Sequence, residues 1–266
     1  MKRALEYTLL DPTGNLTLLA ETPVPTAAQP SVARQLMALE PEAEQVGFVS
    51  FGEDGVSLRM AGGEFCGNAS MSAAALYLER RDSKREQPSC ERSVSVSVSG
   101  TEAPVSVRLR ALPDGAWLAA VTMPQPEEVG KACLPEYGVL PFVRFPGITH
   151  VILEEPMPQA DAEAVAPGWC RHLDAEALGL MFLSRTEGTL KPLVYVPEAG
   201  TLCWESSCAS GTTAVGAYLA AETEQEVCLR LKQPGGTLEI DARPDGMLRL
   251  TGTVRILRSG TGWAED

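Results

Sequence analysis

The sequence has few of the residues that build metal sites and no long apolar run. Only two histidines occur among its 266 residues, and its seven cysteines include no Cys-x-x-Cys pair typical of zinc ligands. We therefore expect no zinc site. No stretch approaches the roughly 18 apolar residues of a membrane-spanning helix, and the N-terminus lacks the apolar segment of a signal peptide.

An excess of basic residues is also missing. The chain has 22 Lys and Arg against 35 Asp and Glu, a formal net charge of −13, which argues against nucleic acids and anionic membranes as partners. The odd number of widely spread cysteines favours reduced thiols in a cytoplasmic enzyme over a disulfide framework. A hydrophobic content of 44% and a charged content of 21% are ordinary for a folded globular protein.

Alternating apolar and polar residues dominate the chain and predict mainly β-strands. The clearest alternation occurs at 93–99, 104–112, 237–242 and 247–257. Fewer segments have helical character, and those at 30–39, 68–81, 174–181 and 212–224 are predicted to be helices. The pattern predicts a mixed α/β (α+β) protein.

Two short segments resemble each other: EFCGNAS at Glu64 to Ser70, and SSCASGT at Ser206 to Thr212. Each is followed by a predicted helix, strand-like runs and a Pro-Asp-Gly turn, at 113–115 and 244–246. A chance match explains one such turn but not the joint order, so we infer an internal duplication. The predicted halves are 1–125 and 126–266, and the last strand is free to pack back on the first half.

The two cysteines of these segments offer acid–base chemistry. A cysteine just before a helix lies beside free backbone N–H groups and the positive end of the helix dipole, which lowers a thiol pKa. The N–H groups that follow, on Gly67, Asn68, Ala209 and Ser210, suit a carboxylate. If the halves face each other, Cys66 and Cys208 are one thiolate base and one thiol acid that invert a carbon bearing a carboxylate. The other five cysteines are expected to be small buried residues.

The same segments resemble those of diaminopimelate epimerases. FCGNASMSAAAL and SCASGTTAVGAYLA match the two catalytic segments of that family, with Ala209 in place of a glycine. TGNLTLL (13–19) and QPGGTLEI (233–240) match two further segments, so the resemblance spans nearly the whole chain. It implies a cofactor-independent racemase or epimerase of two pseudo-symmetric halves, each a curved β-sheet around a central helix.

One departure points to a subgroup. Diaminopimelate epimerases have an arginine in the loop before the second cysteine, whereas WESSC (204–208) keeps Glu205 without the arginine. The short loop, EQVGF (44–48) and QPGG resemble the histidine racemases of staphylopine-type opine metallophore biosynthesis. This resemblance implies conversion of L-histidine to D-histidine, substrate contacts from Asn15, Glu44 and Glu205, and a homodimer.

Three alternatives stay open at this point. The chain could be a true diaminopimelate epimerase or another amino-acid racemase, although proline racemases read Cys-Gly-His where this chain reads Cys-Gly-Asn. From another class, it could be a non-catalytic amino-acid-binding protein in which the two helix N-termini hold a carboxylate. Exchange of the substrate Cα proton distinguishes an enzyme from a binding protein.

Overall fold

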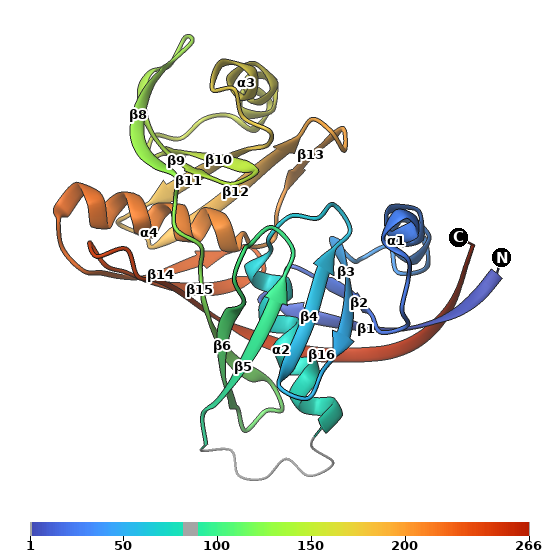
Figure 1. Ribbon diagram of the computed structural model, residues 1–266. Helices are drawn as coiled ribbons and strands as arrows, with labels where there is room; N and C mark the ends of the chain where they lie inside the picture. Colours follow the sequence, from blue (N-terminus) through green and yellow to red (C-terminus); the bar gives the residue numbers. More distant parts are fainter. Residues whose placement is uncertain (1, 82–89, 266) are drawn as a thin grey trace. The chain divides into compact units, whose positions relative to one another are not determined.

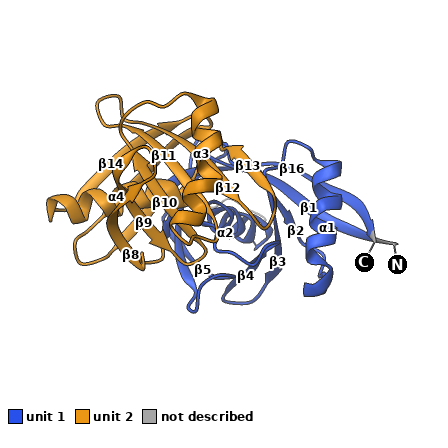
Figure 2. Cartoon of the chain, turned by 90° about the horizontal axis from the view of Figure 1, so that it is seen from above, with its two compact units in different colours: residues 1–122, 251–266 blue, residues 123–250 orange. Residues whose placement is uncertain are grey.

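The computed structural model describes residues 2–81 and 90–265 and divides into two compact units. Unit 1 consists of residues 1–122 and 251–266, and unit 2 of residues 123–250 (Figure 2). The boundary predicted from the sequence is residue 125, with a last strand that is free to return to the first half. In the structure that strand, β16 (Leu248–Glu265), begins in unit 2 and continues through unit 1.

The strands of unit 1 form a closed ring. Their order is β1-β2-β3-β4-β5-β6-β7-β16, and β16 also pairs antiparallel with β1. The strands before β16 are β1 (Lys2–Pro12), β2 (Thr17–Ala20), β3 (Gln45–Phe51), β4 (Gly55–Met60), β5 (Arg92–Val98), β6 (Val105–Ala111) and β7 (Trp117–Thr122). The helices are the short 3-10 helix η1 (Thr26–Ala28), α1 (Gln29–Leu39) and α2 (Gly67–Arg81).

Helix α2 is the core of unit 1. It contacts every strand from β1 to β7 (Figure 1). Its residues from Gly67 to Leu78 are all buried. Half of these residues are alanine or serine, so strands approach the helix closely from all sides. Helix α1 covers a second apolar cluster, which includes Leu5, Leu36 and Ala264. The ring therefore fixes α2, and with it the segment that leads into the helix.

Unit 2 has an open sheet with the order β8-β9-β10-β11-β12-β14-β15, and β13 pairs with β12. The strands are β8 (Glu128–Leu134), β9 (Gly138–Phe145), β10 (Ile148–Leu153), β11 (Leu178–Ser184), β12 (Thr189–Val196), β13 (Thr201–Trp204), β14 (Val227–Gln233) and β15 (Gly236–Ala242). Helix α3 (Gln159–His172) packs on β11 and β12. Helix α4 (Ala209–Thr223) contacts β8 to β11, β14 and β15, so it is the central helix of unit 2.

The two units repeat one connection plan. In unit 1, β2 and β3 pair in parallel, β3 and β4 antiparallel, and β4 and β5 in parallel. In unit 2 the same three relations hold for β10 and β11, β11 and β12, and β12 and β14. The central helices have 15 residues each. The expected fold class, a mixed α+β fold with curved sheet around a central helix, is confirmed.

The predicted helix at 174–181 is wrong. Leu178–Ser184 is strand β11, which pairs in parallel with β10 and antiparallel with β12. A short, continuous apolar run fits a buried strand as well as a helix, and here its pairing on both edges decides the outcome. Helix α3 is not among the predicted helices, and its interior contains Pro167, a residue that usually ends a helix.

The Pro-Asp-Gly turns are confirmed as hairpin turns. They join β6 to β7 and β15 to β16, and their glycines, Gly115 and Gly246, have φ values of 85° and 95°. The expected burial of five cysteines holds only for Cys170. The others, Cys90, Cys133, Cys203 and Cys228, are exposed.

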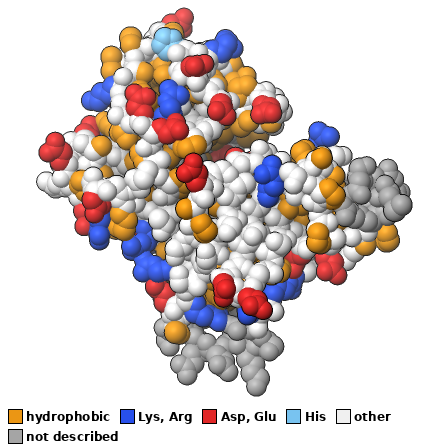
Figure 3. All heavy atoms as spheres, in the orientation of Figure 1, with side chains coloured by type: hydrophobic (Ala, Val, Ile, Leu, Met, Phe, Trp, Pro, Cys, Tyr) orange, Lys and Arg blue, Asp and Glu red, His pale blue; other side chains and the backbone are white. Residues whose placement is uncertain are grey.

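The visible surface in Figure 3 has acidic and basic side chains interspersed among neutral ones. The surface ion pairs include Arg185 with Glu154 and Arg230 with Glu239. Within residues 2–81 and 90–265, no helix has the length and apolar character needed to cross a membrane.

Candidate active site

Cys66 lies in the loop before α2, and the turn between β5 and β6 fixes the position of that loop. The hydroxyl of Ser99 accepts a hydrogen bond from the Met60 N–H at 3.0 Å and donates one to the Glu64 carbonyl at 2.8 Å. Gly100 has a φ of 78°, and a Cβ added there would lie 2.3 Å from the backbone nitrogen of Phe65. Only glycine allows this close approach, so the turn sets the path of the chain into Cys66.

Cys66 occupies the capping position of α2. Its carbonyl accepts from the Ser70 N–H at 2.9 Å, the first bond of the helix, and its Sγ lies 3.4 Å from the Ala69 nitrogen, which donates to it. The thiol in turn donates to Oε1 of Gln45 at 3.2 Å. Sγ therefore has both a donor and an acceptor beside it, in a half-buried position.

Asn15 and Glu44 are linked to Cys66 by a chain of hydrogen bonds through Gln45. Nδ2 of Asn15 donates to the Glu44 carboxylate at 2.6 Å, and its Oδ1 accepts from Nε2 of Gln45 at 2.5 Å. Gly67 and Asn68 are the first residues of α2, where backbone N–H groups have no partner within the helix. Asn68 is 2% exposed, and its Oδ1 is buried without a hydrogen-bond partner among the described residues.

In unit 2, Cys208 is the N-cap of α4. Its φ and ψ of −124° and 110° are extended, and its Sγ accepts a hydrogen bond from the Gly211 N–H at 3.3 Å. The Cys208 N–H donates to Oε1 of Gln233 at 2.9 Å, and Nε2 of Gln233 donates to the Thr212 hydroxyl at 2.8 Å. One glutamine side chain thus joins the end of β14 to the loop and to the first turn of α4.

The electrostatics at Cys208 differ from the sequence-based expectation. Burial, the charge of Glu205 and a hydrogen bond to Glu205 raise the pKa of the Cys208 thiol well above its usual value. Ser210, whose Oγ lies 3.5 Å from Sγ, and the Gly211 N–H act in the opposite direction with smaller effect. The expected lowering of this pKa by the helix N-terminus is therefore wrong for Cys208, because desolvation and a neighbouring carboxylate outweigh the amide.

An apolar wall lies beside Cys208. Met181 on β11 is completely buried, and a Cβ added to Gly211 would lie 2.1 Å from its Sδ and 3.2 Å from Sγ of Cys208. A Cβ added to Gly179 would lie 2.9 Å from Cε of Met181 and 2.1 Å from Nδ1 of His150. The missing side chains of these two glycines thus leave room for Met181 and His150.

The structure groups the predicted residues into two sets. Asn15, Glu44, Cys66, Gly67 and Asn68 form the set in unit 1, and Glu205, Cys208, Ala209 and Ser210 form the set in unit 2. Gln45 and Gln233 were missed as site residues. Both lie in segments that resemble the racemase family, EQVGF and QPGG. The sequence alone, however, does not show that their side-chain amides reach the cysteine segments. Among the described residues, no cluster of His, Cys, Asp and Glu could hold a metal ion.

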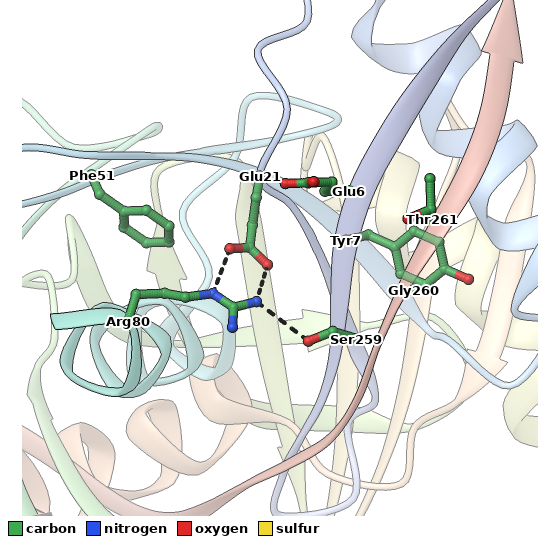
Figure 4. Close-up of a pocket in the computed structure, with 8 residues that line it drawn as sticks. All are labelled: Glu6, Tyr7, Glu21, Phe51, Arg80, Ser259, Gly260 and Thr261. Atoms are coloured by element: carbon green, nitrogen blue, oxygen red, sulfur yellow. Dashed lines mark hydrogen bonds and ion pairs between the residues drawn. The ribbon is translucent and has the colours of Figure 1, made fainter. Parts of the chain in front are cut away.

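A separate pocket of about 550 Å³ lies on unit 1 (Figure 4). Arg80 and Glu21 form an ion pair across it at 2.7 Å, and Tyr7, Phe51 and Ser259 contribute to its walls. None of the predicted site residues lines this pocket. Its one guanidinium is already paired with a carboxylate, so it offers no free charge for an anionic substrate.

Comparison with known proteins identifies the family. A family model described as "Histidine racemase CntK N-terminal domain" matches residues 4–263. A histidine racemase of Fusobacterium nucleatum is 33% identical over 267 residues, covering 97% of each chain. A histidine racemase of Staphylococcus aureus is 26% identical over 283 residues and covers 99% of each chain.

Solved structures support the fold at much lower sequence identity. A predicted epimerase from Pseudomonas aeruginosa has a TM-score of 0.71 at 16% identity, with 96% of this chain and 98% of that one covered. A hydroxyproline epimerase from Agrobacterium vitis has a TM-score of 0.68 at 12% identity, covering 98% of this chain and 91% of the other. With a family match over nearly its full length and a relative at 33% identity, the chain belongs to the histidine racemase family.

Proposed function

We propose that this protein interconverts L-histidine and D-histidine by moving a proton at Cα, with Cys66 and Cys208 as the two acid–base groups. The observation that carries the proposal is the matched placement of the two thiols. Each is the residue before a 15-residue central helix, and each Sγ accepts a backbone N–H from the residue three positions later. Membership of the histidine racemase family supplies the reaction class and substrate.

The helix N-termini provide the second part of the chemistry. The amides of Gly67, Asn68, Ala209 and Ser210 lie in the first turns of α2 and α4, where N–H groups point out of the helix. We propose that they bind the α-carboxylate and stabilise the charge that develops on it when Cα loses its proton. The buried carbonyl oxygen of Asn68 is a suitable acceptor for the substrate ammonium group.

The two thiols have different roles in one turnover. Because burial and Glu205 raise the pKa of Cys208, we propose that Cys208 keeps its proton in the free enzyme and serves as the acid. Cys66 is then the base that removes the Cα proton, and the Ala69 N–H stabilises its thiolate. The Cα–H bond breaks toward Cys66, and a new Cα–H bond forms from Cys208 on the opposite face. The reverse reaction exchanges these roles and needs no metal or pyridoxal phosphate.

The cellular setting is part of the same proposal. All seven cysteines lie in the described part of the chain, and none of them is in a disulfide, which fits a reducing cytoplasm. Production of D-histidine for an opine metallophore is the pathway that the sequence resemblance implies.

The deciding experiment incubates the protein with L-histidine in D2O. We expect D-histidine on chiral chromatography and loss of the Cα proton signal by NMR, without added cofactor. Proline and meso-diaminopimelate are tested as alternative substrates in separate reactions. Exchange with meso-diaminopimelate alone would overturn the assignment of histidine, and no exchange with any amino acid would make this a binding protein.

A further inference from the structure

Gln45 contacts Cys66 in unit 1 but was not among the predicted site residues. It is the first residue of β3, and its side chain makes three hydrogen bonds: Oε1 accepts from the Cys66 thiol, while Nε2 donates to Asn15 and Thr17. The distances from Nε2 are 2.5 Å to Oδ1 of Asn15 and 2.7 Å to Oγ1 of Thr17. Both the oxygen and the nitrogen of the Gln45 side-chain amide are therefore fixed by hydrogen bonds.

The direction of these bonds follows from the chemistry of the groups. An ionised Glu44 carboxylate only accepts, so Asn15 turns its Nδ2 toward Glu44 and its Oδ1 toward Gln45. The Thr17 hydroxyl donates its proton to the Asn15 carbonyl at 2.9 Å, so its oxygen is an acceptor for Gln45. Nε2 of Gln45 must then face Asn15 and Thr17, and its carbonyl oxygen must face Cys66.

We propose that Gln45 is a positioning residue for Cys66: its fixed carbonyl oxygen accepts a hydrogen bond from the thiol that Cys66 becomes when it takes the substrate proton. Asn15 and Glu44 act through Gln45 by fixing its orientation, in place of the substrate contacts expected from the sequence. This inference rests on the proposed function of Cys66.

The arrangement explains how one sulfur serves in both protonation states. The thiolate has the Ala69 N–H as a donor, and the thiol has Oε1 of Gln45 as an acceptor. A neutral amide beside Cys66 destabilises a thiolate less than a carboxylate does. The carboxylate of Glu205 raises the pKa of Cys208 by this effect. The glutamine of unit 2, Gln233, bonds to the backbone N–H of Cys208 and does not repeat this relation to the sulfur.

The test measures how fast iodoacetamide alkylates Cys66 as a function of pH, with each cysteine resolved by peptide mass spectrometry. The variants are Gln45→Glu and Gln45→Leu. Gln35→Leu is the matched control, because Gln35 lies on α1 and bonds to Ser31 one turn earlier. Thermal melting by circular dichroism establishes that each variant is folded, and racemisation of L-histidine is measured in parallel.

We expect Gln45→Glu to move the pH midpoint of Cys66 alkylation upward by about one unit, because a carboxylate then faces the thiolate. Gln45→Leu removes the acceptor of the thiol and should move the midpoint downward, with lower kcat and little change in KM. Gln35→Leu should leave the midpoint and the kinetics unchanged.

The proposal is overturned if both Gln45 variants are folded and keep the wild-type midpoint, or if Gln45→Leu raises KM with kcat unchanged, as a substrate contact would. Failure of the proposed function gives a different result. The wild-type protein would then not racemise histidine, while the Cys66 midpoint would still respond to Gln45.

Discussion

The backbone N–H of Gly211 donates a hydrogen bond to Sγ of Cys208 at 3.3 Å, so the sulfur caps helix α4. Ala69 has the same relation to Cys66 at 3.4 Å. In both places the cap residue is also the proposed acid–base group. Stability and reactivity at these positions can be separated, because a serine hydroxyl is a good helix cap but a poor acid–base group near neutral pH.

Replacing either cysteine by serine should therefore abolish racemisation while the protein stays folded. We expect Cys66→Ser and Cys208→Ser each to lower kcat by at least about 100-fold, the usual contribution of general acid–base catalysis. Chiral chromatography of histidine measures the rate, and thermal melting measures stability. Near-normal turnover in either variant would rule out the two-thiol mechanism.

Removing the charge of Glu205 should make Cys208 more reactive at lower pH. The carboxylate raises the pKa of the Cys208 thiol by its charge and by a hydrogen bond, and Glu205→Gln removes the charge. We expect the pH midpoint of Cys208 alkylation to fall by about one unit. Glu154→Gln, which removes a surface carboxylate paired with Arg185, is the control. A midpoint for Glu205→Gln equal to or above that of the wild type would contradict this reading of the site.

The fold was predictable from the sequence wherever local pattern and tertiary environment agree. The PDG hairpins have both a turn residue with positive φ and alternating strands on either side, and both were predicted correctly. Residues 178–181 were predicted as the end of a helix because their apolar run has no clear period, and only the pairing of β11 with β10 and β12 makes them part of a strand. Helix α3 was missed because Pro167 lies inside it.

The candidate site was predictable to the extent that its residues are close in sequence. Cys66 and its helix N-terminus were found from one short segment. Gln45 lies 21 residues before Cys66 and reaches it only because β3 and the α2 loop lie side by side in unit 1. The high pKa of Cys208 was also out of reach, since burial and the orientation of Glu205 depend on the packed structure.

An alanine at Gly211 should damage the Cys208 site by displacing Met181. The added Cβ would lie 2.1 Å from Sδ of Met181, and we expect Gly211→Ala to destabilise the protein by about 1–3 kcal/mol and to lower kcat. Gly168→Ala on α3 is the matched control, because its Cβ would meet no described atom within 4 Å. The second change Met181→Ala should relieve the clash and recover part of the stability in urea unfolding. No loss of stability in Gly211→Ala would show that Met181 moves freely.

Arg80 should matter for stability but not for turnover. Its guanidinium bonds to Glu21 and to the hydroxyls of Thr8 and Ser259, in the pocket that none of the predicted site residues lines. The Arg80 side chain is 42% exposed, so we expect Arg80→Met to cost no more than about 1 kcal/mol. Urea unfolding measures that cost, and kcat and KM for histidine should match the wild type. A large change in KM would instead assign a substrate role to this pocket.

His150 should make the protein less stable as the pH falls below neutral. Its side chain is completely buried, neither ring nitrogen has a hydrogen-bond partner among the described residues, and burial lowers its pKa from 6.5 to about 3. Between pH 6.5 and 3 the histidine is protonated in the unfolded chain but neutral in the folded protein. Each unit by which the pH is lowered therefore decreases the free energy of unfolding by up to about 1.4 kcal/mol. Urea unfolding between pH 6.5 and 5 should show this slope in the wild type and a flatter one in His150→Phe. His172→Phe removes the other histidine, which is exposed, and should keep the wild-type slope. An unchanged slope in His150→Phe would mean that His150 is already neutral in the unfolded chain or is protonated in the fold.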